Sequence, residues 1–180
     1  MPIALSLAER IAPIELLVLD VDGVLTDGSI VYGNDHLELK AFHVRDGVGL
    51  RFWKDAGKRV ALISGRASAA VTRRAAELEI EPVIQGAAKK LIALREILKV
   101  ANLSPMQVCA IGDDLLDVPV LRQCGLAVAV ADACLEAQQE AHLVTKNPGG
   151  RGAVRELIEI LMQGQGLWSS VVERLREEKL

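Results

Sequence analysis

The sequence predicts an α/β fold built on a doubly wound parallel sheet. Short apolar runs recur between longer amphipathic stretches, which is typical of buried parallel strands joined by crossover helices. Of the 180 residues, 51% are hydrophobic, which is enough for one substantial core, and no linker divides the sequence. We therefore expect a single domain over residues 1–180. The predicted strands are Leu16–Leu19, Val60–Ile63, Pro82–Ile84, Val108–Ile111, Ala127–Val130 and His142–Val144.

Four amphipathic stretches are predicted to form helices between and after these strands. Asp46 is a favoured residue at a helix start and Gly57 at a helix end, so we place the first helix between them. The next three begin at Ser68, span Lys89–Ala101 and span Gly152–Gln163. The remaining segment, residues 164–180, is expected to be a tail that either reaches a neighbouring subunit or is disordered.

Residues 28–42 depart from this alternation and predict an inserted β-hairpin. Its two arms, Ser29–Tyr32 and Leu37–Phe42, flank Gly33-Asn34-Asp35, whose residues tolerate the positive φ of hairpin turns. Leucine and alanine alternate with other residues along the second arm, so one face of the hairpin needs a partner. Because an isolated two-stranded ribbon is only marginally stable in water, we expect a neighbouring subunit to cover it.

Charge and composition narrow the classes of partner. The net charge is −3 and the sequence pI is about 5.7, with lysine and arginine spread along the chain, so we expect neither nucleic acid nor anionic membrane as a partner. No run approaches about 18 apolar residues, and the first residues lack a signal-peptide pattern. The cysteines are odd in number and form no CxxC pair, which predicts a reducing cytoplasm without disulfides or zinc. They are Cys109, Cys124 and Cys134.

The strongest local motif is Asp20-Val21-Asp22, which directly follows the apolar run Leu16–Leu19. Open α/β sheets bind their ligands at the carboxyl ends of the strands, where this motif falls. Side-chain alternation along a strand would turn both carboxylates to one side, toward one reacting centre. Taken alone, the pair is also compatible with an Asp-Gly turn that carries a solvated acid.

Three further polar sites follow in order, each at or just beyond a predicted strand end. Ser64-Gly65 supplies a hydroxyl and a flexible backbone amide suited to phosphate oxygens. Lys90 opens a helix, where a cation is poorly placed unless an anion lies beside it. Asp113 and Asp117 add carboxylates suited to Mg²⁺. Each alone has an ordinary explanation, as a turn, a surface lysine or an acidic helix start, but their order predicts one phosphate and magnesium site.

This series of motifs resembles that of the haloacid dehalogenase superfamily, whose phosphatases show DxD, Ser/Thr, Lys and GDxxxD on a Rossmann-like sheet. The resemblance implies that Asp20 attacks phosphorus, and that Asp22 protonates the leaving alcohol and later activates water. It also implies Mg²⁺ held by Asp20, the main-chain carbonyl of Asp22, and Asp113. Asp114 and Asp117 would support this site.

The same resemblance assigns the phosphate-binding groups. Ser64, Gly65 and Lys90 would bind the phosphoryl oxygens, with Asp117 orienting Lys90. Lys89 is the competing candidate for the lysine.

The interval between Ser64 and Lys90 is too short for the lid domain that most members of the superfamily carry. The chain resembles the lidless, tetrameric subgroup that contains 3-deoxy-D-manno-octulosonate 8-phosphate phosphatase of lipopolysaccharide precursor synthesis. The resemblance implies a cytoplasmic homotetramer that acts on a sugar phosphate, with active sites at subunit interfaces. The stretches that carry it are Asp20–Gly28, Phe42–Asp46, Gly112–Asp117, Val128–Asp132 and Gly149–Arg155.

Three arginines are candidates for binding the substrate. The relative that acts on a nine-carbon sugar acid 9-phosphate has Glu at the position of Arg66, so Arg66 favours the eight-carbon substrate. Arg74 and Arg151 could also reach a sugar carboxylate, although each could equally be solvated. The alternatives left open are the nine-carbon phosphatase and a non-catalytic, phosphatase-like assembly module. A signalling receiver domain fits poorly, because its acidic pair is adjacent and its lysine comes later.

Overall fold

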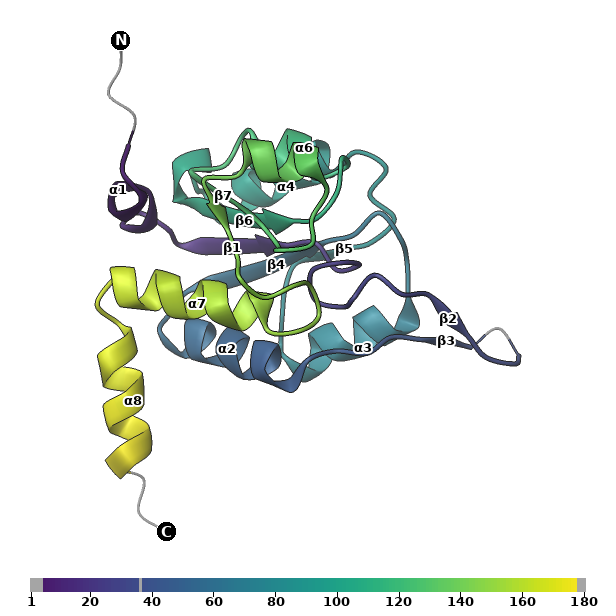
Figure 1. Cartoon of the computed structure of the whole chain (residues 1–180), viewed down its shortest axis with the longest axis horizontal. Coiled ribbons are helices and arrows are strands. Elements are labelled where there is room, and N and C mark those ends of the chain that lie inside the picture. The colour runs from purple at the N-terminus through teal and green to yellow at the C-terminus, as the bar shows by residue number, and fades with distance from the viewer. Residues whose placement is uncertain (1–4, 36, 178–180) are drawn as a thin grey trace.

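The computed structural model describes residues 5–35 and 37–177, which form a six-stranded parallel sheet in the order β5-β4-β1-β6-β7-β8 (Figure 1). The predicted doubly wound α/β fold is confirmed. β1 lies at the centre and pairs with β4 on one side and β6 on the other. The strands are β1 (Leu16–Leu19), β4 (Arg59–Ile63), β5 (Val83–Ile84), β6 (Val108–Gly112), β7 (Leu126–Ala129) and β8 (Leu143–Val144).

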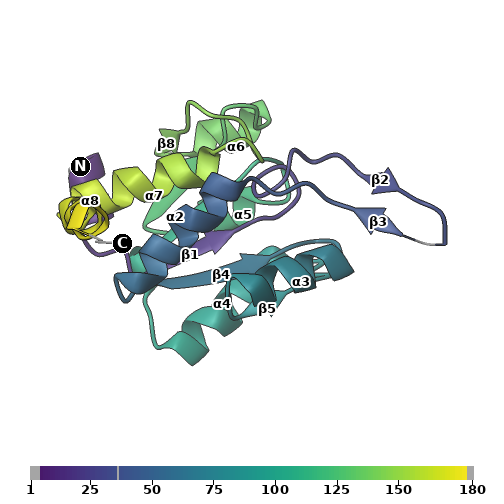
Figure 2. The same ribbon diagram turned by 90° about the horizontal axis from the view of Figure 1, so that it is seen from below.

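Helices cover both faces of the sheet (Figures 1 and 2). One layer contains α2 (Val44–Asp55), α3 (Ala69–Glu77) and α7 (Ala153–Gly164). The other contains α4 (Lys90–Ala101), α5 (Val118–Leu121) and α6 (Leu135–Glu140). The sequence patterns do not predict α5, α6 or the short α1 (Leu7–Ile11), since such helices are too short to show a clear period. Within the described ranges, no helix is long and apolar enough to cross a membrane.

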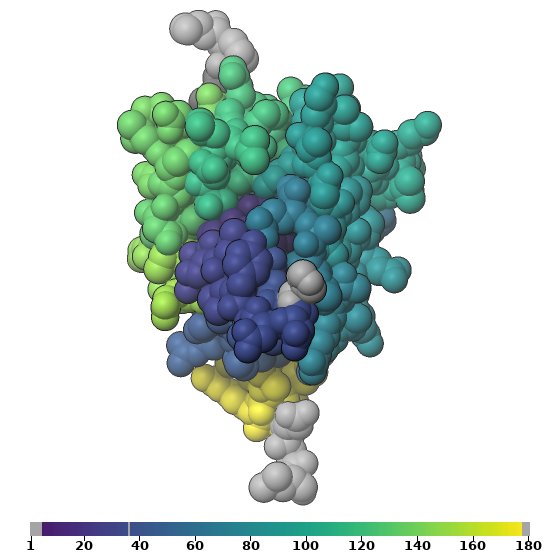
Figure 3. Space-filling model, turned by 90° about the vertical axis from the view of Figure 1, so that its right-hand side faces the viewer, coloured from purple at the N-terminus to yellow at the C-terminus, as the bar shows by residue number. Residues whose placement is uncertain are grey.

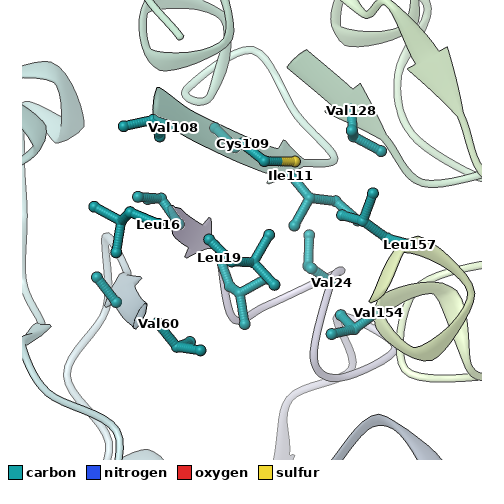
Figure 4. Packing of buried hydrophobic residues seen from close by; sticks show 14 of the residues in the cluster. Leu16, Leu19, Val24, Val60, Val108, Cys109, Ile111, Val128, Val154 and Leu157 are labelled. Carbon is teal, nitrogen blue, oxygen red and sulfur yellow. The ribbon is translucent and has the colours of Figure 1, made fainter. Parts of the chain in front are cut away.

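The core is packed around β1. All four residues of this strand are buried, because sheet neighbours flank it and helices cover both of its faces. Val154 and Leu157 of α7 pack toward Leu19 and Val24 in this core (Figure 4). Burying one such aliphatic side chain contributes roughly 1.5–3 kcal/mol, so the sheet fixes the position of whatever follows β1.

The hairpin projects beyond the carboxyl ends of the sheet strands (Figures 1 and 2). Its paired strands, β2 (Val31–Tyr32) and β3 (Glu38–Leu39), are antiparallel and shorter than predicted. Figure 3, viewed from this end, shows the hairpin in dark blue over the middle of the molecule. In the second arm Leu39 is 51% exposed, whereas the side chain of Lys40 is fully buried. The hairpin therefore turns charge inward and apolar surface outward.

The prediction that Asp46 begins a helix is wrong. Helix α2 starts at Val44, with His43 as its N-cap residue, and Asp46 lies one turn further on with 1% exposure. Its carboxylate accepts a hydrogen bond of 2.7 Å from the backbone N–H of Arg155, in the first turn of α7. Asp46 thus satisfies a free backbone donor at the start of a different helix, which local sequence cannot reveal.

The segment after α7 forms a helix, α8 (Trp168–Glu177), packed on its own chain. Trp168 contacts Phe52 of α2 edge to face, with ring centroids 6.1 Å apart. The guanidinium of Arg155 lies over both rings, at 5.4 Å from Phe52 and 5.2 Å from Trp168. Residues 168–177 are therefore not a disordered tail, whereas the expectation that this segment reaches a neighbouring subunit stays a prediction. The expectation for residues 178–180 lies outside the described part of the chain.

Candidate active site

Asp20 and Lys90 form the centre of the candidate site. Asp20 directly follows β1 and is 8% exposed, while Lys90 is the first residue of α4 and is equally buried. The Lys90 ammonium lies 2.8 Å from Asp20 Oδ1 and 2.7 Å from Asp117 Oδ1. Lys89, the alternative lysine, is exposed at the N-cap position of the same helix. The structure therefore brings Lys90, and not Lys89, to the end of β1.

The Asp117 carboxylate bridges Lys90 and the loop after β6. One carboxylate oxygen accepts from Lys90, and the other accepts from the backbone N–H groups of Asp113 at 3.0 Å and Asp114 at 3.3 Å. Asp114 itself is exposed. These bonds fix the loop and turn Asp113 toward Asp20.

Side-chain oxygens of Asp20, Asp113 and Asp117 lie within 4.8 Å of one another, which fits a divalent cation that prefers oxygen ligands. Both oxygens of Asp117 already accept hydrogen bonds, so Asp20 and Asp113 are the better ligands and Asp117 the better support. The side chain of Asp22 lies outside this cluster and bonds to Lys40 instead. A contribution from Asp22 to the metal would have to come from its main-chain carbonyl.

The carboxylates of this cluster repel one another strongly. Burial, together with the charge of Asp117, raises the pKa of Asp20 to about 6, although Lys90 opposes the change. Burial and the charges of Asp20 and Asp117 raise the pKa of Asp113 to about 8. Burial alone would lower the pKa of Lys90, but Asp20 and Asp117 raise it above its ordinary value. A bound dication would relieve this repulsion, so the donor set fits Mg²⁺.

Ser64 and Gly65 follow β4 at the same edge of the sheet. Ser64 is 2% exposed, and its hydroxyl oxygen accepts a hydrogen bond of 3.1 Å from the backbone N–H of Arg66. This bond leaves the hydroxyl proton free to be donated. Gly65 is exposed, and a Cβ added there would meet nothing within 4 Å, so its backbone is open to an incoming oxyanion.

The hairpin contributes two residues that sequence reasoning misses. The Lys40 ammonium donates a hydrogen bond to Asp22 Oδ1 and lies 3.3 Å from Glu38 Oε1. Arg66 donates to Glu38 Oε2 at 2.9 Å, and its Nε lies 3.9 Å from Asp22 Oδ2. The available signal was the alternation in the second arm, which places Glu38 and Lys40 on the face opposite the leucines.

The other two predicted arginines lie apart from the carboxylates. Arg74 pairs with Glu77 at 3.3 Å, and its guanidinium lies 5.8 Å from the ring centre of Phe42. The side chain of Arg151 is 70% exposed and lies 3.9 Å from Asp27, in the loop that follows the DxD motif. The structure thus associates Arg66 directly with Asp22, whereas Arg74 and Arg151 have other partners.

The loop after β8 closes against the loop that carries the DxD motif. A Cβ at Gly149 would overlap the carbonyl oxygen of Gly23, and a Cβ at Gly150 would overlap the backbone of Thr26. The Gly150 N–H also donates to the Val24 carbonyl at 2.8 Å. Only glycine allows this approach, so the two residues hold the loop that carries the DxD motif in place.

A cavity of about 940 Å³ lies elsewhere. Leu16 and Arg59, the first residues of β1 and β4, help to line it together with mainly apolar side chains of α3 and α4. Residues 80–85, which include the edge strand β5, complete its lining, so the cavity follows this edge of the sheet between α3 and α4. None of the clustered carboxylates lines this cavity, so the candidate site is the carboxyl edge of the sheet.

Comparison with known proteins agrees with this geometry. A family model of haloacid dehalogenase-like hydrolases matches residues 80–157. The chain is 47% identical over 164 residues to the 3-deoxy-D-manno-octulosonate 8-phosphate phosphatase KdsC of Yersinia pestis, with 91% of this chain and 88% of that protein covered.

Two solved structures show the same likeness. One is the phosphatase of the same name from Moraxella catarrhalis, in complex with magnesium ion, phosphate ion and KDO. It has a TM-score of 0.91 and 38% identity, covering 93% of this chain and 97% of that one. The other is the cobalt-bound deoxy-D-mannose-octulosonate 8-phosphate phosphatase of Haemophilus influenzae. It has a TM-score of 0.85 and 39% identity, covering 87% and 92%.

The likeness extends over most of the length of this chain and of each relative. The superfamily predicted from the motifs is confirmed, and the enzyme class is that of a phosphatase. The chain belongs to the 3-deoxy-D-manno-octulosonate 8-phosphate phosphatase family of haloacid dehalogenase-like hydrolases.

Proposed function

We propose that this protein is a cytoplasmic, Mg²⁺-dependent phosphatase that hydrolyses 3-deoxy-D-manno-octulosonate 8-phosphate to KDO and phosphate. The step would belong to lipopolysaccharide precursor synthesis, and the whole chain, residues 1–180, would form the one phosphatase domain. The observation that carries the proposal is the placement of the Lys90 ammonium between Asp20 and Asp117 at the carboxyl end of β1. This arrangement leaves a buried carboxylate beside a fixed cation, which suits attack on a phosphate.

In the proposed mechanism Asp20 is the nucleophile and Asp22 the acid and base. An oxygen of Asp20 attacks phosphorus, the bond from phosphorus to the sugar oxygen breaks, and Asp22 gives a proton to the departing oxygen. Asp22 then takes a proton from water, the water oxygen attacks phosphorus, and the bond to Asp20 breaks. Phosphate leaves, Asp20 is again a free carboxylate and Asp22 again carries the proton with which it began, so the reaction proceeds in two steps.

Mg²⁺ would be held by Asp20, Asp113 and the main-chain carbonyl of Asp22, with Asp114 and Asp117 as support. When bound, it supplies positive charge that offsets the repulsion between a carboxylate nucleophile and a phosphate. The raised pKa values of Asp20 and Asp113 support this assignment, because burial and neighbouring carboxylates raise them and the single Lys90 ammonium does not offset this rise. The magnesium in the Moraxella catarrhalis structure supports it as well.

Ser64, Gly65 and Lys90 would bind the phosphoryl oxygens through a hydroxyl, a backbone amide and an ammonium. Arg66 would bind the sugar carboxylate, and its position beside Asp22 supports this role. Arg74 and Arg151 would assist recognition, either from the same chain or across a subunit boundary.

We also propose that the protein assembles as a homotetramer through the hairpin, so that a neighbour helps to complete each active site. Five apolar residues on the hairpin are 44% to 71% exposed. Such a group of exposed apolar residues is unfavourable in water and marks a site of interaction with another protein. They come from both arms of the ribbon, which by itself would be marginally stable. The residues are Ile30, Val31, Tyr32, Leu37 and Leu39.

The alternatives have less support. A nine-carbon sugar acid 9-phosphate is less favoured, because the relatives named above act, by their names, on the eight-carbon phosphate. A non-catalytic assembly module would have no need for the buried ion pairs of Lys90 with Asp20 and Asp117, which are costly to maintain without a function.

The test is a phosphate-release assay with both sugar acid phosphates, in the presence and absence of Mg²⁺. We expect Mg²⁺-dependent turnover that favours the eight-carbon substrate. Asp20→Asn should abolish turnover, and Asp22→Asn should severely reduce it, because the first step loses its acid and the second step loses its base. Wild-type turnover in Asp20→Asn would end the mechanism, and a preference for the nine-carbon substrate would end the substrate assignment.

A further inference from the structure

The second arm of the hairpin carries charges that are unusual for a projecting ribbon. The side chain of Lys40 is fully buried and that of Glu38 is 18% exposed, whereas Leu37 and Leu39 between and beside them are about half exposed. A buried ammonium is costly unless it is paired and hydrogen-bonded. A ribbon that only needed to fold would place its leucines inward, so the inward charges require another explanation.

These charges contact Asp22 and Arg66, two partly exposed residues of the candidate site. Lys40 bonds to Oδ1 of Asp22, while Glu38 Oε2 accepts from Arg66 at 2.9 Å. Lys40 and Glu38 also form an ion pair of 3.3 Å, so two cations and two anions make one balanced cluster. The buried Nε of Arg66 has no hydrogen-bond partner among the described residues, so this edge of the guanidinium is free.

We infer that Lys40 and Glu38 are positioning residues for the two halves of the reaction, an inference that rests on the proposed function. Lys40 fixes Asp22 through Oδ1, which leaves Oδ2 as the oxygen that exchanges the proton with the leaving group and the water. Glu38 fixes Arg66 by accepting a hydrogen bond from its Nη2. This bond holds Nε of Arg66 at 3.9 Å from Oδ2 of Asp22. The inner face of the hairpin is therefore part of the active site in its own chain, independent of any neighbour.

The two roles predict opposite kinetic effects. A general acid that is free to rotate loses rate and not affinity, so Lys40→Met should lower kcat on the sugar acid phosphate about 100-fold with little change in KM. A loosened arginine loses affinity for the carboxylate, so Glu38→Gln should raise KM about tenfold and leave kcat nearly unchanged.

The experiment compares the sugar acid phosphate with p-nitrophenyl phosphate, which has no carboxylate and whose leaving group needs no proton. In rapid-mixing measurements, the first-turnover release of p-nitrophenol should be nearly unchanged in both variants. Lys40→Arg should recover most of the kcat that Lys40→Met loses, because it restores the donor. Lys58→Met is the matched control, since Lys58 pairs with Glu15 at 2.8 Å at the far end of the sheet and should leave kcat and KM unchanged.

Wild-type kcat in Lys40→Met would overturn the inference, as would equal losses with the two substrates, which would indicate a purely structural ion pair. If Lys40→Met does not fold, Lys40→Gln on the same two substrates decides the question. Asp22→Asn distinguishes failure of this inference from failure of the proposed function. If it is inactive while Lys40→Met is unimpaired, the inference alone fails, whereas if it keeps wild-type activity the proposed function fails.

Discussion

The central strand and the hairpin differ in where they place their apolar side chains. β1 is apolar along its length, buried on both faces and paired on both edges, so it needs nothing beyond its own chain. The hairpin turns Glu38 and Lys40 inward and leaves Val31 and Leu39 about half exposed. The comparison indicates a division of labour, in which the sheet places the reacting groups and the hairpin supplies positioning and, as proposed, assembly.

Lys90→Met tests the buried charges at the carboxyl end of the sheet and has the largest expected effect. Removing this cation leaves two buried carboxylates unpaired, which should destabilise the metal-free protein by about 3 kcal/mol. Activity should fall by about 10³-fold or more, since a charge that faces the phosphate is lost. Phosphate-release assays and urea denaturation measure the two effects. Lys89→Met, which alters the exposed neighbour, should change neither, and an equal effect of both substitutions would contradict the assigned role of Lys90.

A second prediction compares the two regions in stability alone. Leu17→Ala opens a cavity in β1, where the side chain is fully buried, and should lower the free energy of unfolding by about 3 kcal/mol. Leu39→Ala removes a half-exposed side chain from the hairpin and should cost less than about 0.5 kcal/mol at low protein concentration. Urea titrations followed by circular dichroism measure both values. Similar losses in the two variants would remove the contrast between sheet and hairpin.

A third prediction concerns the exposed apolar face of the hairpin. Leu39→Glu puts a charge on the apolar face and should convert the proposed homotetramer to smaller species while leaving the protomer folded. Catalytic efficiency should fall about tenfold, because each site would lose a contribution from its neighbour. Sedimentation analysis and the phosphate assay follow both properties. Val100→Glu, on an exposed position of α4, is the control, and an unchanged sedimentation coefficient in Leu39→Glu would count against assembly through the hairpin.

The smallest expected effect concerns pH and metal. The pKa values of Asp20 and Asp113, about 6 and about 8, exceed the ordinary 3.8, so these groups favour folding at low pH. This contribution is lost as the pH rises through those values. Mg²⁺ should therefore raise the melting temperature more at about pH 8.5 than at about pH 5.5, by about 3 °C. Scanning calorimetry measures the difference, which Asp113→Asn should largely remove. Equal shifts at both pH values would speak against the cluster as the metal site.

Sequence reasoning succeeds where a local pattern and the global fold agree. The apolar run before Asp20 predicts a buried strand, and the rule that ligands bind at strand ends then locates Asp20, Ser64 and Asp113 at one edge. It fails where the meaning of a residue depends on a distant contact. Asp46 has the chemistry of a helix cap, yet its carboxylate serves a helix that begins far along the chain. Lys40 has the chemistry of a solvated lysine until the hairpin folds over the strand ends.

The contact of Gly149 and Gly150 with the DxD loop also has a consequence for how the enzyme is made. The ribosome delivers the chain from its N-terminus, so Asp20 and β1 emerge early, while the two glycines arrive only after β8 has been synthesised. Until then the backbone of residues 23–27 lacks the surface that holds it. A nascent chain therefore cannot hold the loop after Asp20 in its final conformation before β8 and the two glycines are made, so we expect activity to appear late in biosynthesis.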